Sequence, residues 1–124
     1  MAFLIDTHVF VWLATADRRL SKRVRDLLFS GNDEVMISVI SPWELVLKQR
    51  NTAFRLPEPF EVLMARTPLV PLDLAFGTQR LVASLPDIHA DPFDRMLIAQ
   101  SLLHGLTLIT GDEQIWKYPL DTFW

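Results

Sequence analysis

The sequence contains no cysteine, and that absence alone excludes several classes of protein. A chain without thiols forms no disulfides, no thiolate zinc site and no cysteine nucleophile. The absence also suits a reducing compartment, so we expect a cytoplasmic protein.

A strong excess of charge of either sign is missing as well. The chain has 12 Lys and Arg against 15 Asp and Glu, a formal net charge of −3. Non-specific binding of DNA needs a clear basic excess, so we do not expect this chain to coat DNA. Half of the 124 residues are hydrophobic, which excludes intrinsic disorder. We therefore expect one globular domain over residues 1–124.

Long hydrophobic runs are also absent. The longest stretch without Asp, Glu, Lys or Arg runs from Met96 to Gly111, 16 residues in all. A bilayer needs about 20 apolar residues, so we expect no membrane span. The first residues lack a basic flank before an apolar run, and Asp6 interrupts that run, so we expect no secretory signal either.

Short apolar runs alternate with helical patterns along the chain. The runs predict strands at 2–5, 35–39, 69–72 and 106–110, with an edge strand at 122–124; the segments between them predict helices at 7–16, 22–29, 61–66 and 74–85, and two more that open at Ser41 and at Asp91. Buried runs separated by helices are typical of a parallel sheet covered on both faces. The predicted fold class is α/β, a three-layer α/β/α sandwich with a central parallel sheet.

Four acids follow or approach the ends of these strands. Asp6 comes directly after the first strand, Glu44 lies in the helix after the second, and Asp112 comes shortly after the fourth. Asp94 opens the helix that leads into the fourth strand, and the spacing alone leaves its position open. In α/β folds, ligands bind at the carboxyl ends of parallel strands. This edge is therefore the candidate site.

Each acid also has a purely structural interpretation. Glu44 ends the segment SPWE (41–44), at the third helical position after the expected N-cap Ser41, where it would complete a capping box. Asp94 holds the same position in DPFD (91–94), where the helix dipole favours an acid and Asp91 would be the N-cap. Asp6 is a candidate N-cap, and Asp112 a candidate turn residue.

The convergence of the acids favours a divalent metal ion. Carboxylates held within a few ångströms repel one another unless a cation neutralises them. With no cysteine and no histidine pair at i, i+4, the ligands would be oxygens, which suits Mg²⁺ or Mn²⁺. Such ions, held by acids, are the usual apparatus for hydrolysing a phosphodiester.

Four segments resemble a known family in their order and spacing. FLIDTHVFVW, SPWELVLK, DPFDRMLIAQ and LITGDEQIWKY resemble PIN domains, and most of all the VapC-type toxins of bacterial toxin–antitoxin pairs. The resemblance covers essentially the whole chain; residues 51–56 depart from the Gly-Lys-Leu-like turn common in the family, which affects only a loop. It implies a metal-dependent endoribonuclease that acts as the toxin of a type II system and inhibits translation or growth. Carried onto this sequence, the catalytic and metal-binding acids are Asp6, Glu44, Asp94 and Asp112, supported by Thr7, Thr110, Asp91 and Arg95.

The resemblance also implies partners. A chain that resembles VapC-type toxins is expected to form a homodimer and to pair with a small VapB-like antitoxin. That antitoxin would block the acidic site and carry the DNA-binding function. RNA is the implied substrate, and DNA is contacted only through the antitoxin. We expect attack by water, which leaves a 5′-phosphate and a 3′-hydroxyl. The alternative is a PIN-like scaffold that binds RNA or protein without cutting.

Several neighbouring side chains have competing interpretations. Arg95 either contacts an RNA phosphate or balances its acidic neighbours, and Lys48 is placed to form an i, i+4 pair with Glu44. The three histidines are scattered, so we expect no acid–base catalysis from them: His8, His89 and His104. Three tryptophans are expected in the core or an interface rather than stacked on bases: Trp12, Trp43 and Trp116.

Overall fold

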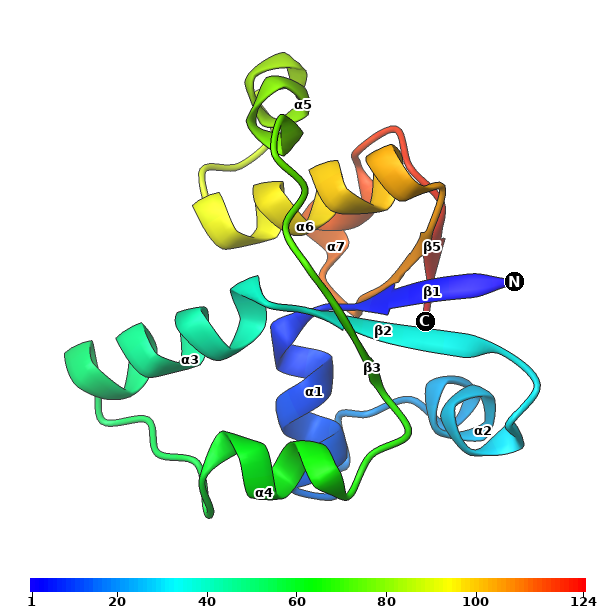
Figure 1. Ribbon diagram of the computed structural model, residues 1–124, viewed down its shortest axis with the longest axis vertical. Helices are drawn as coiled ribbons and strands as arrows, with labels where there is room; N and C mark the ends of the chain where they lie inside the picture. Colours follow the sequence, from blue (N-terminus) through cyan, green and yellow to red (C-terminus); the bar gives the residue numbers. More distant parts are fainter.

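The computed structural model describes residues 1–124 and has three layers (Figure 1). The middle layer is a sheet of β1 (Ala2–Ile5), β2 (Glu34–Ser38), β3 (Val70–Leu72), β4 (Thr107–Ile109) and β5 (Thr122–Phe123). The helices are α1 (Thr7–Ala14), α2 (Lys22–Ser30), α3 (Ile40–Asn51), α4 (Phe60–Ala65), α5 (Thr78–Ser84), α6 (Pro92–His104) and α7 (Glu113–Trp116). In Figure 1, α1, α2 and α4 lie below the sheet, and α5, α6 and α7 lie above it. The predicted α/β/α sandwich is confirmed.

The order of the strands creates one crevice at the edge of the sheet. All neighbouring strands are parallel, in the order β3-β2-β1-β4-β5. The chain moves outward from β1 through β2 to β3 and then returns to the other side of β1 with β4. In open parallel sheets, ligands bind where the direction of winding reverses. That point lies between β1 and β4, at their carboxyl ends.

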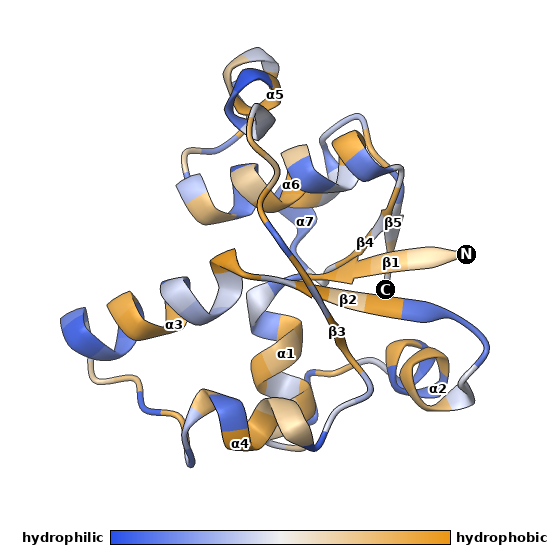
Figure 2. Ribbon diagram, in the orientation of Figure 1, coloured by the Kyte–Doolittle hydropathy of each residue, from blue (hydrophilic) through white to orange (hydrophobic).

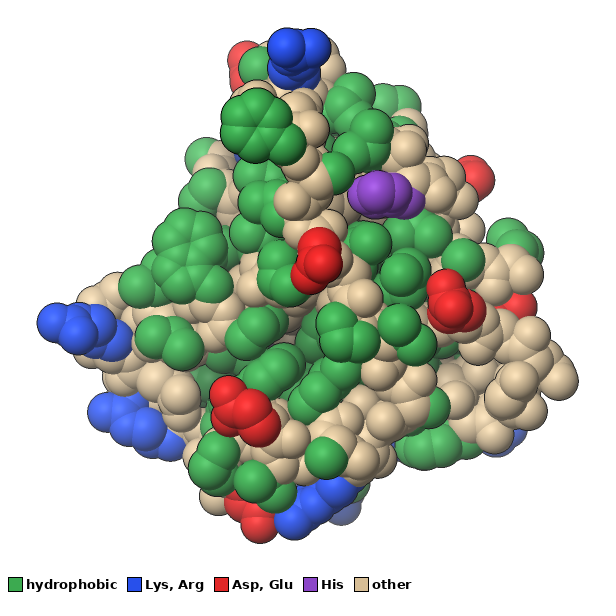
Figure 3. Space-filling model, viewed as in Figure 1, with side chains coloured by type: hydrophobic (Ala, Val, Ile, Leu, Met, Phe, Trp, Pro, Cys, Tyr) green, Lys and Arg blue, Asp and Glu red, His purple; other side chains and the backbone are tan.

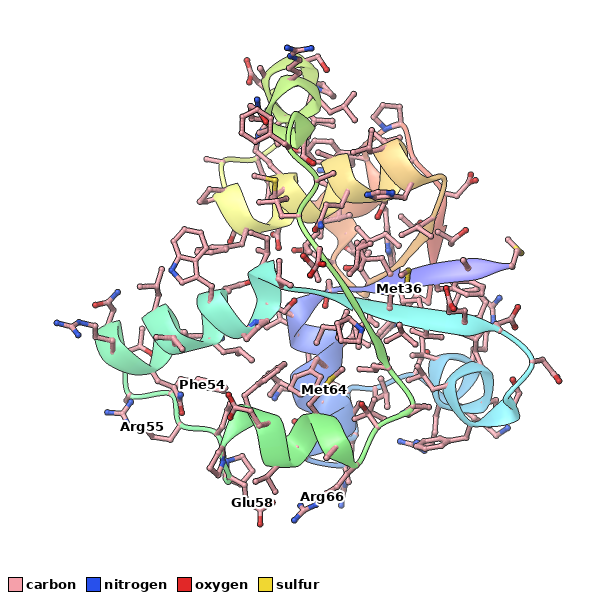
Figure 4. The ribbon with its side chains drawn as sticks, viewed as in Figure 1. Met36, Phe54, Arg55, Glu58, Met64 and Arg66 are labelled. Carbon is pink, nitrogen blue, oxygen red and sulfur yellow. The ribbon has the colours of Figure 1, made fainter.

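The two faces of the sheet bury separate hydrophobic clusters. Phe3 and Ile5 of β1 belong to the cluster under α1, α2 and α4, whereas Leu4 belongs to the cluster under α6. Met64 of α4 packs on the first cluster and Met36 of β2 on the second, and both are labelled in Figure 4. Figure 2 shows hydrophobic residues along the strands and on the helices that flank them. Both faces are therefore covered, as the parallel sheet requires.

Most helix ends agree with the sequence signals. Asp6, Ser21 and Asp91 are N-caps whose side chains accept a backbone N–H three residues on. Gly31 and Gly105 end α2 and α6 in the left-handed conformation that glycine adopts without a steric penalty. None of the helices is long and apolar enough to span a membrane.

The start of α3 differs from its prediction. The helix begins at Ile40, whose N–H donates to Ser38 Oγ at 3.1 Å, so Ser41 is not the N-cap. Ser41 is fully buried, and Glu44 becomes the fifth helical residue. The capping-box interpretation of Glu44 is therefore wrong, because its carboxylate is too far along the helix to reach the N-cap amide.

Two other helices also differ from the prediction. The short helix α7 was not expected; it is capped by Asp112, whose Oδ1 accepts the Gln114 N–H at 2.9 Å. The helix expected at 74–85 is confined to α5, because Gly77 at φ 102° ends the preceding turn in a conformation incompatible with a continuous helix.

Candidate active site

Two acids follow the strands that border the crevice. Asp6, after β1, is 3% exposed, and its Oδ1 accepts the Val9 N–H at 2.8 Å. Its own N–H donates to Ile109 O at 3.0 Å, which extends the pairing of β1 with β4 by one step. Thr110, after β4, is fully buried, and its Oγ1 accepts the Asp112 N–H at 3.1 Å. These bonds hold Asp6 inside the crevice and Asp112 at its exposed mouth.

The third acid comes from α6. Asp94 is 8% exposed, and its Oδ2 lies 3.0 Å from His89 Nε2. The N-cap Asp91 accepts the Asp94 N–H at 2.9 Å and is itself exposed. Asp94 is therefore held from both sides, by its helix cap and by an imidazole.

A series of hydrogen bonds behind Asp94 indicates the tautomer of His89. The Tyr118 hydroxyl lies 2.7 Å from His89 Nδ1 and accepts an Arg95 N–H at 3.1 Å. Because the phenol oxygen already accepts from Arg95, its proton is free to go to Nδ1. A neutral His89 then carries its proton on Nε2 and donates to Asp94. Only one oxygen of Asp94 is used in this way, and the other remains for a ligand.

Arg95 supports the site from behind rather than at its surface. Besides Tyr118, its guanidinium donates to Pro86 O at 2.8 Å and to Val82 O at 3.2 Å, at the end of α5. It forms no ion pair with the acids. Its observed contacts therefore anchor Tyr118 and the loop that carries His89.

The fourth acid comes from α3. Glu44 lies near Thr7 of α1, whose Oγ1 is 2.9 Å from Ser41 Oγ in a buried contact between the two helices. Glu44 Oε1 is buried and has no hydrogen-bond partner. Lys48, one turn on, does not pair with Glu44; its Nζ lies 4.7 Å from the centre of the Phe54 ring. Glu44 thus presents an unsatisfied oxygen at the site, which is costly without a ligand.

The electrostatics show that these carboxylates act on one another. Burial raises the pKa of Asp6 above its ordinary value, and the charge of Asp112 adds to this, while Thr110, the Val9 amide and His8 oppose it. Burial also raises the pKa of Glu44, with further contributions from Asp91 and Asp6 and opposition from Thr7 and His8.

Asp94 is affected in the same way. Burial, followed by the charges of Asp91, Asp6 and Glu44, raises the pKa of Asp94 to about 6 despite the hydrogen bond from His89. Negative charge is therefore concentrated where desolvation already disfavours it, a pattern that is typical of functional sites.

The donor set fits a hard divalent cation. The structure contains no group of three acids or histidines close enough to hold a metal ion as they stand. Mg²⁺ keeps several of its waters and needs only one or two carboxylates directly, so a closed cage is not required. A cation would satisfy the Glu44 oxygen that has no partner, and it would offset the repulsion that Asp112 exerts on Asp6 and that Asp6 exerts on Asp94.

The sequence did not predict the side chains that contact the acids from behind. His89 was considered only as a rival catalyst, and nothing in the sequence linked Tyr118 or Ser41 to the site. The position of His89, five residues before Asp94 at the entry to α6, is the one signal that could have revealed it. Tyr118 lies 29 residues beyond His89, so only the fold brings them together.

The sequence matches the model of the PIN domain family over residues 3–119. This chain belongs to the PIN-domain family. It is 27% identical over 118 residues to ribonuclease VapC22 of Mycobacterium tuberculosis, covering 90% of this chain and 88% of that protein. The fold of this PIN domain is similar to VapBC2 of Rickettsia felis bound to a DNA fragment from their promoter, with a TM-score of 0.76, 15% identity and coverage of 99% and 98%. It is also similar to DNA-bound VapBC of Salmonella typhimurium, with a TM-score of 0.74, 17% identity and coverage of 99% and 97%.

Proposed function

We propose that this PIN domain is a divalent-metal-dependent endoribonuclease and the toxin of a VapC-type toxin–antitoxin pair, acting in the cytoplasm. The observation that carries the proposal is the acidic cluster of Asp6, Glu44 and Asp94 at the reversal point of the sheet. The charge of Asp6 helps to raise the pKa of Glu44, and the charges of Asp6 and Glu44 help to raise the pKa of Asp94. The likeness to a ribonuclease of the VapC type supports RNA as the substrate class.

Asp6, Asp94 and Asp112 would hold Mg²⁺ or Mn²⁺, and Glu44 would accept a hydrogen bond from the attacking water through its free Oε1. Such an ion supplies a nucleophile at neutral pH and neutralises charge on the phosphate. His89 keeps Asp94 oriented, and Thr110 fixes the backbone that carries Asp112. Attack by water leaves a 5′-phosphate and a 3′-hydroxyl.

The experiment is cleavage of total cellular RNA by the purified chain, with Mn²⁺, with Mg²⁺ and with EDTA. Asp6→Asn and Asp94→Asn are expected to abolish the cleavage. Asp26→Asn, which changes an exposed acid paired with Lys22 on α2, serves as the matched control and is expected to cleave normally. Fragments that form in EDTA, or that end in a 2′,3′-cyclic phosphate, would contradict the proposal. Intact protein that binds RNA without cutting it would favour the scaffold alternative.

The proposal includes two protein partners. The solved relatives include VapBC complexes bound to DNA, and a VapB-like antitoxin is expected to block this acidic site and to carry the contact with DNA. A second copy of the chain is expected as well, because large hydrophobic side chains are exposed, among them Trp43, Val46, Leu74 and Phe76. Figure 3 shows that hydrophobic side chains cover much of one face of the molecule. Light scattering should give twice the 14.3 kDa of one chain, and added antitoxin should stop the cleavage.

A further inference from the structure

A small hollow lies beside Glu44, between α1 and α3. Its volume is about 250 Å³, and we call it the α1–α3 hollow. Trp12 of α1 forms part of one wall, and Lys48 and Phe54 form part of the other. Phe54 belongs to the segment that follows α3 and is labelled beneath that helix in Figure 4. A catalytic acid and two aromatic rings therefore border the same space.

Cations accompany both aromatic rings. Arg19 lies 5.0 Å from the centre of the Trp12 ring, and Lys48 Nζ lies 4.7 Å from the centre of the Phe54 ring. Arg19 also forms an ion pair with Asp17 at 2.8 Å, which offsets its charge. Lys48 has no acidic partner, so its charge remains available to a ligand.

A second hollow of about 370 Å³ lies on the other side of Glu44. Glu44, Lys48 and His8 line both hollows and form the ridge between them. A strand that crossed this ridge would pass the acidic cluster and enter the α1–α3 hollow without leaving the surface. Because the acids repel phosphate, a strand so placed needs a cation nearby, and Lys48 is the free cation on the ridge.

We infer that the α1–α3 hollow binds one base of single-stranded RNA next to the bond that is cleaved. The base packs against the Trp12 and Phe54 rings, and Lys48, which lies over the Phe54 ring in the free protein, turns to contact a flanking phosphate. This inference rests on the proposed ribonuclease function and adds a binding site for one base beside the acids. Aromatic side chains accept any base because every base has a π face. The volume lies below the roughly 300–1,000 Å³ of pockets for drug-sized ligands, which suits a single base.

Trp12 was expected in the core or an interface rather than stacked on a base, and this inference differs from that expectation. Trp12 is half-buried: it contacts Trp124 edge-on, with ring centres 5.8 Å apart, and also lines the hollow. Its role in packing makes it a poor choice for a test, because its loss would weaken the fold. Phe54 lies outside the helices, in the segment after α3, and a tyrosine there keeps the ring, so Phe54 and Lys48 are the positions to change.

The test measures the binding of a short fluorescent single-stranded oligoribonucleotide, with Ca²⁺ in place of Mg²⁺ so that the strand stays intact. Phe54→Leu removes the ring and keeps an apolar side chain, whereas Phe54→Tyr keeps the ring. Phe29→Leu, on the exposed face of α2, is its matched control. Lys48→Gln removes the cation, and Arg50→Gln on the exposed end of α3 is the control for that change.

Phe54→Leu is expected to weaken binding about tenfold, the size typical of one stacked base, and Phe54→Tyr to restore it. Lys48→Gln is expected to lower the slope of log K against log salt by about 0.7, the loss of one phosphate contact on a single strand. The same strand with one abasic position should bind the wild type as weakly as the intact strand binds Phe54→Leu. Both controls should bind like the wild type.

The outcomes separate this inference from the proposed function. If the wild type binds the oligoribonucleotide with the expected effects of Phe54→Leu and Lys48→Gln but does not cleave RNA in Mn²⁺, the proposed ribonuclease function is wrong and the base site stands. Cleavage by the wild type, with Phe54→Leu and Lys48→Gln matching their controls, would overturn the base site and leave the hollow to a side chain of a protein partner. Equal binding of single-stranded and duplex RNA would overturn the base site as well, since a paired base cannot enter the hollow.

Discussion

Gly111 illustrates how one missing side chain shapes the mouth of the site. A Cβ at this position would lie 2.8 Å from Cε2 and Cζ2 of the Trp124 ring. The φ of Gly111 is not positive, so the close approach of the ring, and not backbone conformation, requires glycine here. Trp124 thereby packs directly against the residue that precedes Asp112.

Gly111→Ala is expected to lower the free energy of unfolding by about 1–3 kcal/mol, the usual effect of overpacking. Urea denaturation measures the loss. In a Trp124→Leu background the same substitution should have a smaller effect, because the clashing ring is gone. Equal effects in both backgrounds would show that Trp124 is not the reason for the glycine.

His89 tunes the charge of Asp94. Its hydrogen bond lowers a pKa that burial and neighbouring acids raise to about 6. We expect His89→Asn to raise the pKa of Asp94 further, because the imidazole no longer favours the carboxylate. Carbon-13 NMR of the carboxyl group measures the shift. His104→Asn, on the exposed end of α6, is the control, and a shift of the same size there would argue against the assignment.

At the scale of elements, one buried pair joins the helices that carry Glu44 and Asp94. Ser38 Oγ, at the end of β2, donates to Gln100 Oε1 of α6 at 2.5 Å and accepts the Ile40 N–H that opens α3. Both side chains are buried. The start of α3 is therefore fixed against the middle of α6.

Gln100→Leu is expected to cost about 1–3 kcal/mol of stability, because the Ser38 hydroxyl loses its acceptor in the interior. Ser38→Ala should lower the free energy of unfolding less in the Gln100→Leu protein than in the wild type, because the two side chains act as a pair. Thermal or urea unfolding gives both values. The exposed Gln79→Leu on α5 is the control; strict additivity of the two buried substitutions would contradict the coupling.

The elements also show what the sequence can predict. Caps such as Asp6 and Asp91 were predicted from local signals, because the acceptor and the amide lie three residues apart. The start of α3 was not, because Ser41 faces Thr7 of another helix, and a contact 34 residues away overrides the local N-cap preference. Tertiary contacts of this kind leave no periodic trace in the sequence.

For the whole molecule, the carboxyl edge of the sheet was predicted as the location of the acids, whereas the strand order was not. Hydrophobic runs indicate buried strands but carry no information on which strands are neighbours. That β4 lies beside β1 is decided by packing across the full chain. The proximity of Asp6 and Asp112 follows from that pairing.

The stability of the whole molecule is expected to respond to pH and divalent cations together. The pKa of Asp94 is raised from 3.8 to about 6, so the folded chain binds a proton more tightly than the unfolded chain. The contribution of Asp94 to the free energy of unfolding therefore favours the folded chain at low pH and is lost as the pH rises from about 4 to about 6. A divalent cation binds only the deprotonated carboxylate of Asp94, so a bound cation stabilises the folded chain at a pH where that carboxylate is charged.

We accordingly expect Mn²⁺ to raise the Tm more at about pH 7.5 than at about pH 5. Differential scanning fluorimetry measures both shifts. Asp94→Asn should reduce the shift at the higher pH, while Asp26→Asn should leave it unchanged. An equal shift at both pH values, in all three proteins, would place the cation elsewhere on the surface.

The pairing of β1 with β4 has a consequence for synthesis of the chain. The ribosome makes residues 2–5 early, but their partner strand at 107–109 is made only near the end of synthesis. At about 5–20 residues per second, roughly 5–20 s pass between the two strands. During that time the central strand lacks one neighbour, and Asp6 has no Asp112 beside it. Until β4 is made, the crevice at the carboxyl edge of the sheet therefore lacks one of the two strands that border it.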